Sequence, residues 1–224
     1  MATTGTTGYA PSLGEIGLNA FSRISIRGPE ITQGHMLTLR QEANLMQASW
    51  SNRGPNLWTV DLQTVAITQG QIQVTVPTDT VTILDAYIND GTSDRPILPI
   101  SRTDYASYPD KTTQGAPTAF WFDRLIAPVL NLYPAPDQAY TLNYYRYRQI
   151  QDAATAAAVN LEIPYLWLDA AAAGLAHRLA RHFKPEIEAQ RKADADEAYA
   201  IAAEQNTENA PLFIQPGLSV YYQT

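Results

Sequence analysis

The spacing of apolar residues along this chain changes twice, near Pro55 and again near residue 163. Before Pro55, apolar residues recur every three or four positions, which is the period of one face of an α-helix. Between the two changes they alternate with polar residues, as in a β-strand with one buried face. The helical period then returns. This order predicts a β-rich segment placed between two helical segments.

Two helices are predicted before the first change, over residues 13–25 and 33–53. Ser12 and Glu15 have the spacing of a capping box, in which each side chain bonds a backbone N–H at the helix start. Five apolar residues form a seam along the second helix, suited to packing against other helices: Met36, Leu39, Ala43, Met46 and Trp50.

The middle of the chain is predicted to form short strands separated by turns. Nine of the fifteen prolines lie between Pro55 and Pro136, and Asn89-Asp90-Gly91 is a strong hairpin-turn signal. The strand candidates are residues 58–63, 71–76, 80–89, 119–124, 129–133 and 140–147. Short strands at this spacing are typical of a small antiparallel sandwich or barrel.

Two more helices are predicted over residues 165–183 and 186–205, separated by Lys184-Pro185. Neither helical pair can bury its apolar stripe well alone, so we expect the two pairs to pack together. The expected fold is α+β: a four-helix bundle of N- and C-terminal helix pairs, an inserted small antiparallel β-sandwich or barrel, and an extended C-terminal arm. The expected boundaries are 11–54 and 162–206 for the bundle, 55–161 for the β domain and 207–224 for the arm.

Composition and charge exclude several classes of function. Apolar residues make up 45% of the 224 residues and charged residues 17%, which is typical of a globular protein. A net charge of −7 argues against a surface that wraps nucleic acid. There is no cysteine, and therefore no thiolate metal site or cysteine nucleophile. We see no signal peptide and no apolar stretch long enough for a membrane span, so we expect a soluble protein without a membrane partner.

No motif for catalysis or cofactor binding is found. Phosphate-binding glycine loops and the G-x-S-x-G nucleophile elbow do not occur. The histidines are His35, His177 and His182, and the last two are five positions apart, hence on different faces of a helix. We therefore expect no enzyme, no metal and no cofactor.

The last residues, 207–224, combine apolar side chains with two prolines and a glycine. Apolar side chains in such a terminal segment are costly to leave in water unless something covers them. We expect this arm to bind a partner, through Pro211, Leu212, Phe213, Ile214, Val220, Tyr221 and Tyr222.

Several short motifs resemble those of tailed-phage head-to-tail adaptor proteins, also called head-completion or connector proteins. They are I-S-R-T-D-Y from Ile100, G-A-P from Gly115, F-W-F-D-R from Phe120, P-V-L-N-L-Y-P-A-P-D from Pro128 and Y-x-L-x-Y-x-x-x-R from Tyr140. The stretch L-N-A-F-S-R-I-S-I from Leu18 is also similar to the start of such adaptors. An insertion of about 100 residues resembles the larger adaptors of this kind.

The resemblance implies a structural virion neck protein that is assembled in the host cytoplasm. Such adaptors form a ring, commonly of twelve copies, that joins the portal protein to the tail and continues the DNA channel. The implied partners are therefore the portal, a tail nozzle or tail tube protein, and further copies of the chain. DNA would pass through without sequence-specific binding, and the arm would lie along the portal.

Two alternatives depend on the β region. One is a carbohydrate-binding module or a tail-fibre or baseplate piece, since Tyr105, Trp121, Phe122 and Tyr133 could hold a sugar. The other is a peptidoglycan hydrolase, which needs two carboxylates beside a cleft. Its candidates are Asp104, Asp123 and Asp137.

A strand rich in tyrosine and arginine could also stack bases or sugars, although such tyrosines more often form cross-strand pairs. Its residues are Tyr140, Tyr144, Tyr145, Arg146, Tyr147 and Arg148.

Overall fold

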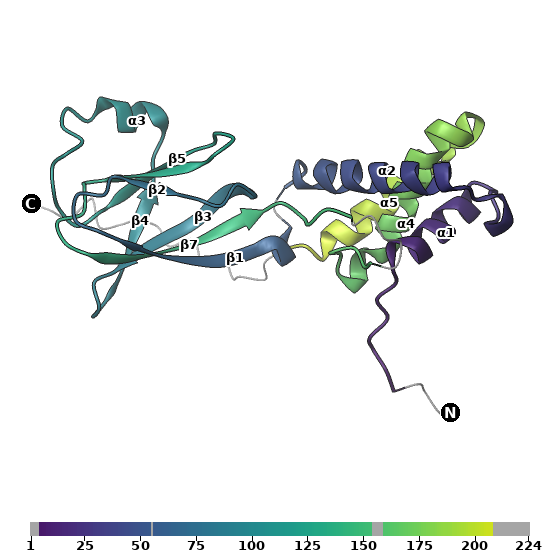
Figure 1. Cartoon of the computed structure of the whole chain (residues 1–224), viewed down its shortest axis with the longest axis horizontal. Helices are drawn as coiled ribbons and strands as arrows, with labels where there is room; N and C mark the ends of the chain where they lie inside the picture. Colours follow the sequence, from purple (N-terminus) through teal and green to yellow (C-terminus); the bar gives the residue numbers. More distant parts are fainter. Residues whose placement is uncertain (1–4, 55, 154–158, 208–224) are drawn as a thin grey trace, which may run out of the picture.

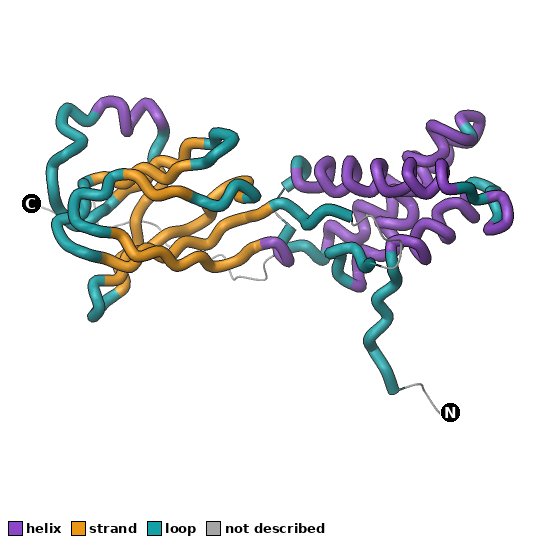
Figure 2. The backbone as a smooth tube through the Cα atoms, in the orientation of Figure 1, coloured by secondary structure: helices purple, strands orange, loops and turns teal. Residues whose placement is uncertain are grey.

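The computed structural model describes residues 5–54, 56–153 and 159–207. The molecule is elongated, with most helices gathered at one end and the strands at the other (Figure 1). Figure 2 shows the chain passing from helices into strands and back, so that the strand region is an insertion between helical segments. The predicted domain boundaries within this order stay a prediction.

The helical part contains α1 (Leu13–Arg23), α2 (Gln33–Ser51), α4 (Leu168–Phe183) and α5 (Glu188–Glu204). The predicted capping box of α1 is confirmed. The backbone N–H of Glu15 donates to Ser12 Oγ over 3.3 Å, and the backbone N–H of Ser12 donates to Glu15 Oε2 over 2.8 Å. Short 3₁₀ turns connect the elements at Gly28–Glu30, Leu57–Thr59, Tyr165–Trp167 and Pro185–Ile187.

The predicted four-helix bundle is wrong, because α4 forms the centre of the helical part. Helices α1, α2 and α5 all pack against α4, and α5 lies mainly along α4. Four consecutive residues of α4, Ala170 to Ala173, are buried, so this helix is covered on several faces. A bundle helix buries one stripe, whereas a helix buried all round belongs to the core of the fold. The sequence pattern was interpreted as a single stripe, which gave the wrong arrangement.

Two glycines allow this close packing of helices. A Cβ atom at Gly17 of α1 would lie 2.2 Å from Leu39 Cδ2 of α2. A Cβ atom at Gly174 of α4 would lie 2.7 Å from Met46 Sδ, also on α2. Side chains at these positions would push the helices apart, so α2 can pack where it does because both residues lack one.

The strands form one seven-stranded sheet that curls into a nearly closed barrel. Their bounds are β1 (Val60–Ile67), β2 (Gln73–Thr75), β3 (Thr80–Asn89), β4 (Asp94–Pro99), β5 (Ala119–Asp123), β6 (Val129–Tyr133) and β7 (Tyr140–Arg148). The order is β1-β7-β3-β4-β5-β6-β2, with β1 and β2 at the two edges. The predicted barrel is therefore present. The purely antiparallel pairing is wrong, because β4 and β5 pair in parallel through Leu98 and Pro99.

A short fifth helix, α3 (Arg102–Ser107), lies at the strand end of the molecule and packs on β5 (Figure 1). It makes the parallel pairing possible, because α3 and the chain after it carry the crossover from β4 to β5.

Polar contacts fasten the barrel to the helices. The hydroxyl of Tyr147 on β7 lies 3.2 Å from the carbonyl oxygen of Ser51 and 3.1 Å from that of Gly54. Arg148, the next residue, donates two hydrogen bonds to Glu162, which precedes α4. Trp58, in the chain that enters the barrel, has its ring 4.9 Å from that of Trp167 in the helical core.

Candidate interaction surfaces

The predicted arm residues, Pro211 to Ile214 and Val220 to Tyr222, lie outside the described residues. The chain that leads to them ends at the junction between helices and barrel. There Asn206 Oδ1 accepts a hydrogen bond of 2.9 Å from the backbone N–H of Leu57. Asn206 is therefore fixed to the 3₁₀ turn Leu57–Thr59, between α2 and β1.

The three histidines have structural contacts. His35 accepts a hydrogen bond from the backbone N–H of Thr32, and its ring lies between Phe21 and Phe183, with ring centroids 5.6 Å and 4.5 Å away. His177 pairs with Glu188 over 2.8 Å, and His182 pairs with Glu42 over 2.9 Å. In the part of the chain that the structure describes, no group of three or more potential metal ligands comes together.

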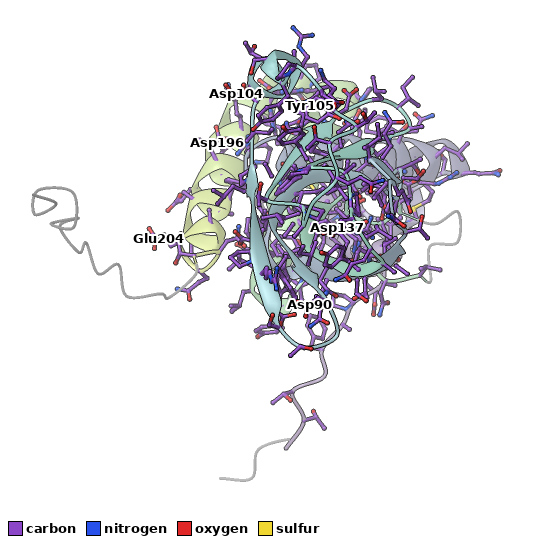
Figure 3. All side chains as sticks on the ribbon, turned by 90° about the vertical axis from the view of Figure 1, so that its left-hand side faces the viewer. Asp90, Asp104, Tyr105, Asp137, Asp196 and Glu204 are labelled. Atoms are coloured by element: carbon purple, nitrogen blue, oxygen red, sulfur yellow. The ribbon has the colours of Figure 1, made fainter. Side chains whose placement is uncertain are left out.

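Two of the three candidate catalytic carboxylates, Asp104 and Asp137, lie apart and have structural partners. Asp104 caps α3 by accepting from Ser101 Oγ over 2.7 Å, and Asp137 accepts from the hydroxyl of Tyr140 over 2.7 Å. Asp123 ends β5. Figure 3 shows Asp104 and Asp137 well apart on the barrel end of the molecule. This geometry does not favour a hydrolase, whose two carboxylates must flank one bond.

The aromatic residues of the barrel pack against one another. Tyr108 stacks on Tyr133 with ring centroids 3.7 Å apart, and Tyr105 contacts Trp121 at 5.4 Å. These pairs attach α3 and the chain after it to β5 and β6. Tyr105 is buried, whereas Tyr108, Trp121 and Tyr133 are half-buried, so these rings pack on one another at the edge of the barrel rather than in its core.

Two of the four tyrosines of β7, Tyr140 and Tyr144, lie in the barrel core, and Tyr147 faces the helical part. Tyr140, Tyr144 and Tyr147 are buried, whereas Tyr145 is 41% exposed. Packing inside the barrel is thus the role of Tyr140 and Tyr144, as the structural interpretation expected.

The arginines of β7 are neutralised by carboxylates. Arg146 is buried and donates to both Asp61 and Asp79. Burial alone would raise the pKa of Asp61, but the hydrogen bonds and charge of Arg146 outweigh it, so this pKa lies below its ordinary value. Arg148 is paired with Glu162. Neither guanidinium is therefore well placed to bind a phosphate backbone.

A cleft between α2, α4 and α5 contains several cations. Arg178 pairs with Glu42 over 3.2 Å, and Arg53 stacks over the ring of Tyr199 at 4.3 Å. Lys192 also lines this cleft. The carboxylates around it offset much of the positive charge, which agrees with the acidic balance of the whole chain.

The hairpin between β5 and β6 carries exposed apolar residues that sequence reasoning missed. Ile126 is 98% exposed and Leu125 is 59% exposed. Such a tip costs free energy in water, so it is a candidate for contact with another protein. The available signal was two apolar residues, Leu125 and Ile126, directly after the charged pair Asp123 and Arg124.

In this elongated chain many ionisable groups are paired in structural contacts, and apolar side chains are exposed at several points, which are features of an assembly protein. The sequence model of the family described as "SU10 adaptor protein" matches residues 18–215. This match covers more than half of the chain, so the chain belongs to the SU10 adaptor protein family, a family of phage head-to-tail adaptors. A comparison with curated proteins found no match.

The protein is therefore a structural phage adaptor and a component of the virion. It interacts with other head or tail proteins of the phage. Among the described residues, no helix is both long enough and apolar enough to cross a membrane.

Proposed function

We propose that copies of this adaptor form a ring of twelve. The ring joins the portal to the tail and continues the DNA channel. The observation that carries the proposal is the family match, which runs from α1 through the barrel to residue 215. The matched region includes Pro211 to Ile214, so the first half of the predicted arm belongs to it. The tail-side partner would be a nozzle or tube protein.

The shape of the chain suits a ring. Rings close through heterologous contacts, in which two different surfaces of neighbouring copies meet. The described surface has exposed apolar residues on the helices and, separately, on the barrel. They are Leu18, Leu37 and Leu45 on the helices, and Leu98, Leu125 and Ile126 on the barrel. These two groups are candidates for the contacts between copies.

The acidic balance suits a channel that DNA slides through. A net charge of −7 per copy, repeated around a ring, repels the phosphate backbone over the range of the Debye length. DNA would therefore pass without being held and without sequence-specific contacts.

The arm would attach the ring to the portal. A modest contact made by each arm, repeated around the ring, gives a large total avidity. We therefore expect the arm residues Pro211 to Ile214 and Val220 to Tyr222 to contribute most of the attachment, although each copy alone binds weakly.

The test is light scattering after size exclusion, on the protein alone and mixed with its portal. The full chain is expected to join the portal as a ring of many copies, and deletion of residues 210–224 to abolish joining without loss of the fold. A truncated protein that still joined the portal would contradict the proposal.

A matched pair of triple variants sharpens this experiment. Leu212→Ser, Phe213→Ser and Ile214→Ser together remove the apolar side chains and should weaken attachment at least about tenfold. Gln215→Ser, Ser219→Ala and Gln223→Ser together change polar residues of the same arm and should leave attachment unchanged. Equal effects of the two triples would show that apolar contacts do not carry the attachment.

A further inference from the structure

A groove with a volume of about 310 Å³ lies between α2 and residues 149–153, the segment that follows β7. Helix α2 contributes Gln47, Ala48 and Asn52 to its walls, and the β3 end of the barrel contributes Val81. Asp152 is the one charged side chain among the described residues that line the groove. The site is therefore nearly uncharged, unlike the cleft on the other side of α2.

The walls of the groove are held in place by hydrogen bonds. The backbone N–H of Ala153 donates to Asn44 Oδ1 of α2 over 2.7 Å, and Arg40 Nε donates to the carbonyl oxygen of Ala153 over 3.3 Å. At the other end of the segment, the backbone N–H of Gln149 donates to the carbonyl oxygen of Asp79 over 2.8 Å. A ligand would thus meet a groove that is already formed, which lowers the entropy cost of binding.

Gln47 is the unusual residue of this groove. Its side chain is 3% exposed, and neither Oε1 nor Nε2 has a hydrogen-bond partner in the described chain. Leaving such a group unpaired costs about 1–3 kcal/mol. A side-chain amide has donors and an acceptor, and a peptide group also presents one N–H donor and one C=O acceptor. A segment of extended polypeptide would therefore satisfy Gln47 on both atoms.

One exposed apolar side chain of α2 lies near the groove. Leu45, on the next turn of α2, is 56% exposed. Arg124 Nη2 donates to Thr82 Oγ1 over 2.9 Å, which ties the start of the β5–β6 hairpin to the strand that carries Val81. The groove itself is lined by both polar and apolar residues, the apolar ones being Ala48, Val81 and Ile150. The ligand that fits is therefore extended and uncharged, with both polar and apolar side chains.

We propose that this groove holds the C-terminal segment of the same copy, residues 208–224. The composition matches, because residues 209–224 contain no Asp, Glu, Lys or Arg and include apolar residues around Phe213 and Tyr221. The described chain ends at the junction of the two parts, since Asn206 is bonded to Leu57 in the 3₁₀ turn between α2 and β1.

The length of the segment is sufficient. Seventeen residues can span about 56 Å when extended, and α2 with its side chains is about 10–12 Å wide. The segment can therefore pass around α2 and enter the groove from the junction. The contact would keep the apolar residues of the C-terminal segment out of water in the free protein. It concerns a single copy, so it can be tested in the absence of the portal.

The chain contains no cysteine, so an engineered pair of cysteines reports on this contact without disulfides from native cysteines. We would combine Ala48→Cys in the groove with Tyr221→Cys in the segment, in the otherwise full chain. A disulfide requires Cα atoms within about 7 Å. Mild oxidation should link the pair inside the monomer, detected by mobility in non-reducing gels and by mass spectrometry of the linked peptides.

The matched control combines Leu62→Cys with Tyr221→Cys. Leu62 is exposed on β1, five residues from the anchor Leu57, but it does not line the groove. We expect the Ala48 pair to form at least about ten times faster than this control. Equal rates would overturn the proposal, and a link between two copies would overturn it in favour of exchange of the segment between copies.

Gln47→Met, added to the Ala48 pair, tests the role of the unpaired amide. Methionine keeps a similar volume but offers no hydrogen-bond donor, so the link should form several times more slowly. Circular dichroism and thermal unfolding verify that the variant is folded. An unchanged rate in folded Gln47→Met protein would overturn the role assigned to Gln47, whereas the Ala48 and Leu62 comparison stands independently of this variant.

Discussion

The helical part and the barrel bury apolar residues of different sizes. The helical core contains many small residues, among them Ala20, Ala43, Ala170, Ala171, Ala172, Ala176 and Ala180. The barrel core is filled by large ones, with Ala86 as the exception: Ile67, Ile83, Ile88, Ile97, Phe120, Leu130, Leu132, Leu142 and Tyr144 are among them.

The difference follows from the geometry of the two parts. Helix backbones approach closely where side chains are small, so α4 can contact three helices at once. The interior of a small barrel has a width set by its strands, and side chains must fill it. Replacing a large buried side chain by a smaller one should therefore destabilise the barrel most. Replacing a small buried residue by a larger one should destabilise the helical part most.

The largest effect is expected for Leu142→Ala in the barrel. Leu142 is fully buried at the centre of β7, so truncation removes buried area and leaves a cavity. Urea unfolding should show a loss of about 3 kcal/mol in the free energy of unfolding. Leu84→Ala on the outer face is the control and should stay within about 0.5 kcal/mol. Similar small losses for both variants would mean that the barrel is not closely packed.

Gly17→Ala should destabilise the helical part by about 1–3 kcal/mol. Its new Cβ atom would lie 2.2 Å from Leu39 Cδ2, and Leu39 is fully buried. Gly34→Ala is the same substitution in α2, where the Cβ atom would lie 3.6 Å from Thr32 Oγ1, an ordinary contact. It should stabilise by about 0.5 kcal/mol, because alanine favours helix. Thermal unfolding compares the two, and a stable Gly17→Ala protein would contradict the close approach of α1 and α2.

The smallest effect concerns the link between the two parts. The hydrogen bonds that Arg148 donates hold the pKa of Glu162 below its ordinary value of 4.5. Since the folded state favours the ionised carboxylate, this contribution is present above pH 4.5 and is lost as the pH falls through the lowered folded pKa.

Glu162→Gln should therefore lower stability by about 1 kcal/mol at pH 7 and by little at pH 3. Urea unfolding at several pH values measures this difference. A loss of equal size at both pH values would indicate a packing effect rather than an ionic one.

Sequence reasoning succeeded where local rules decide the structure. The Ser12–Glu15 capping box, the seam of α2 and the turn at Asn89-Asp90-Gly91 depend on residues close together in the chain. The hairpin turn, for example, has Gly91 at φ 92°, a conformation that favours glycine. Strand β4 was missed because Pro96 and Pro99 interrupt its pattern, and prolines usually argue against a strand.

The candidate sites depended on contacts between distant residues. Asp104 and Asp137 could be named from their aromatic neighbours, but their separation on the barrel is visible only in three dimensions. The groove beside Gln47 had no sequence signal, because its walls come from α2, the start of β3 and the segment after β7.

The sequence by itself determined the order of the helical and strand regions, several caps and turns, and the membership in a phage adaptor family. These properties follow from the period of apolar residues and from local hydrogen bonding. The tertiary structure decided that α4 is central, that β4 and β5 run in parallel, and that an unpaired amide lies in the groove between the two parts. Those features depend on which surfaces meet after folding, and the spacing of residues in one element does not specify its partners in space.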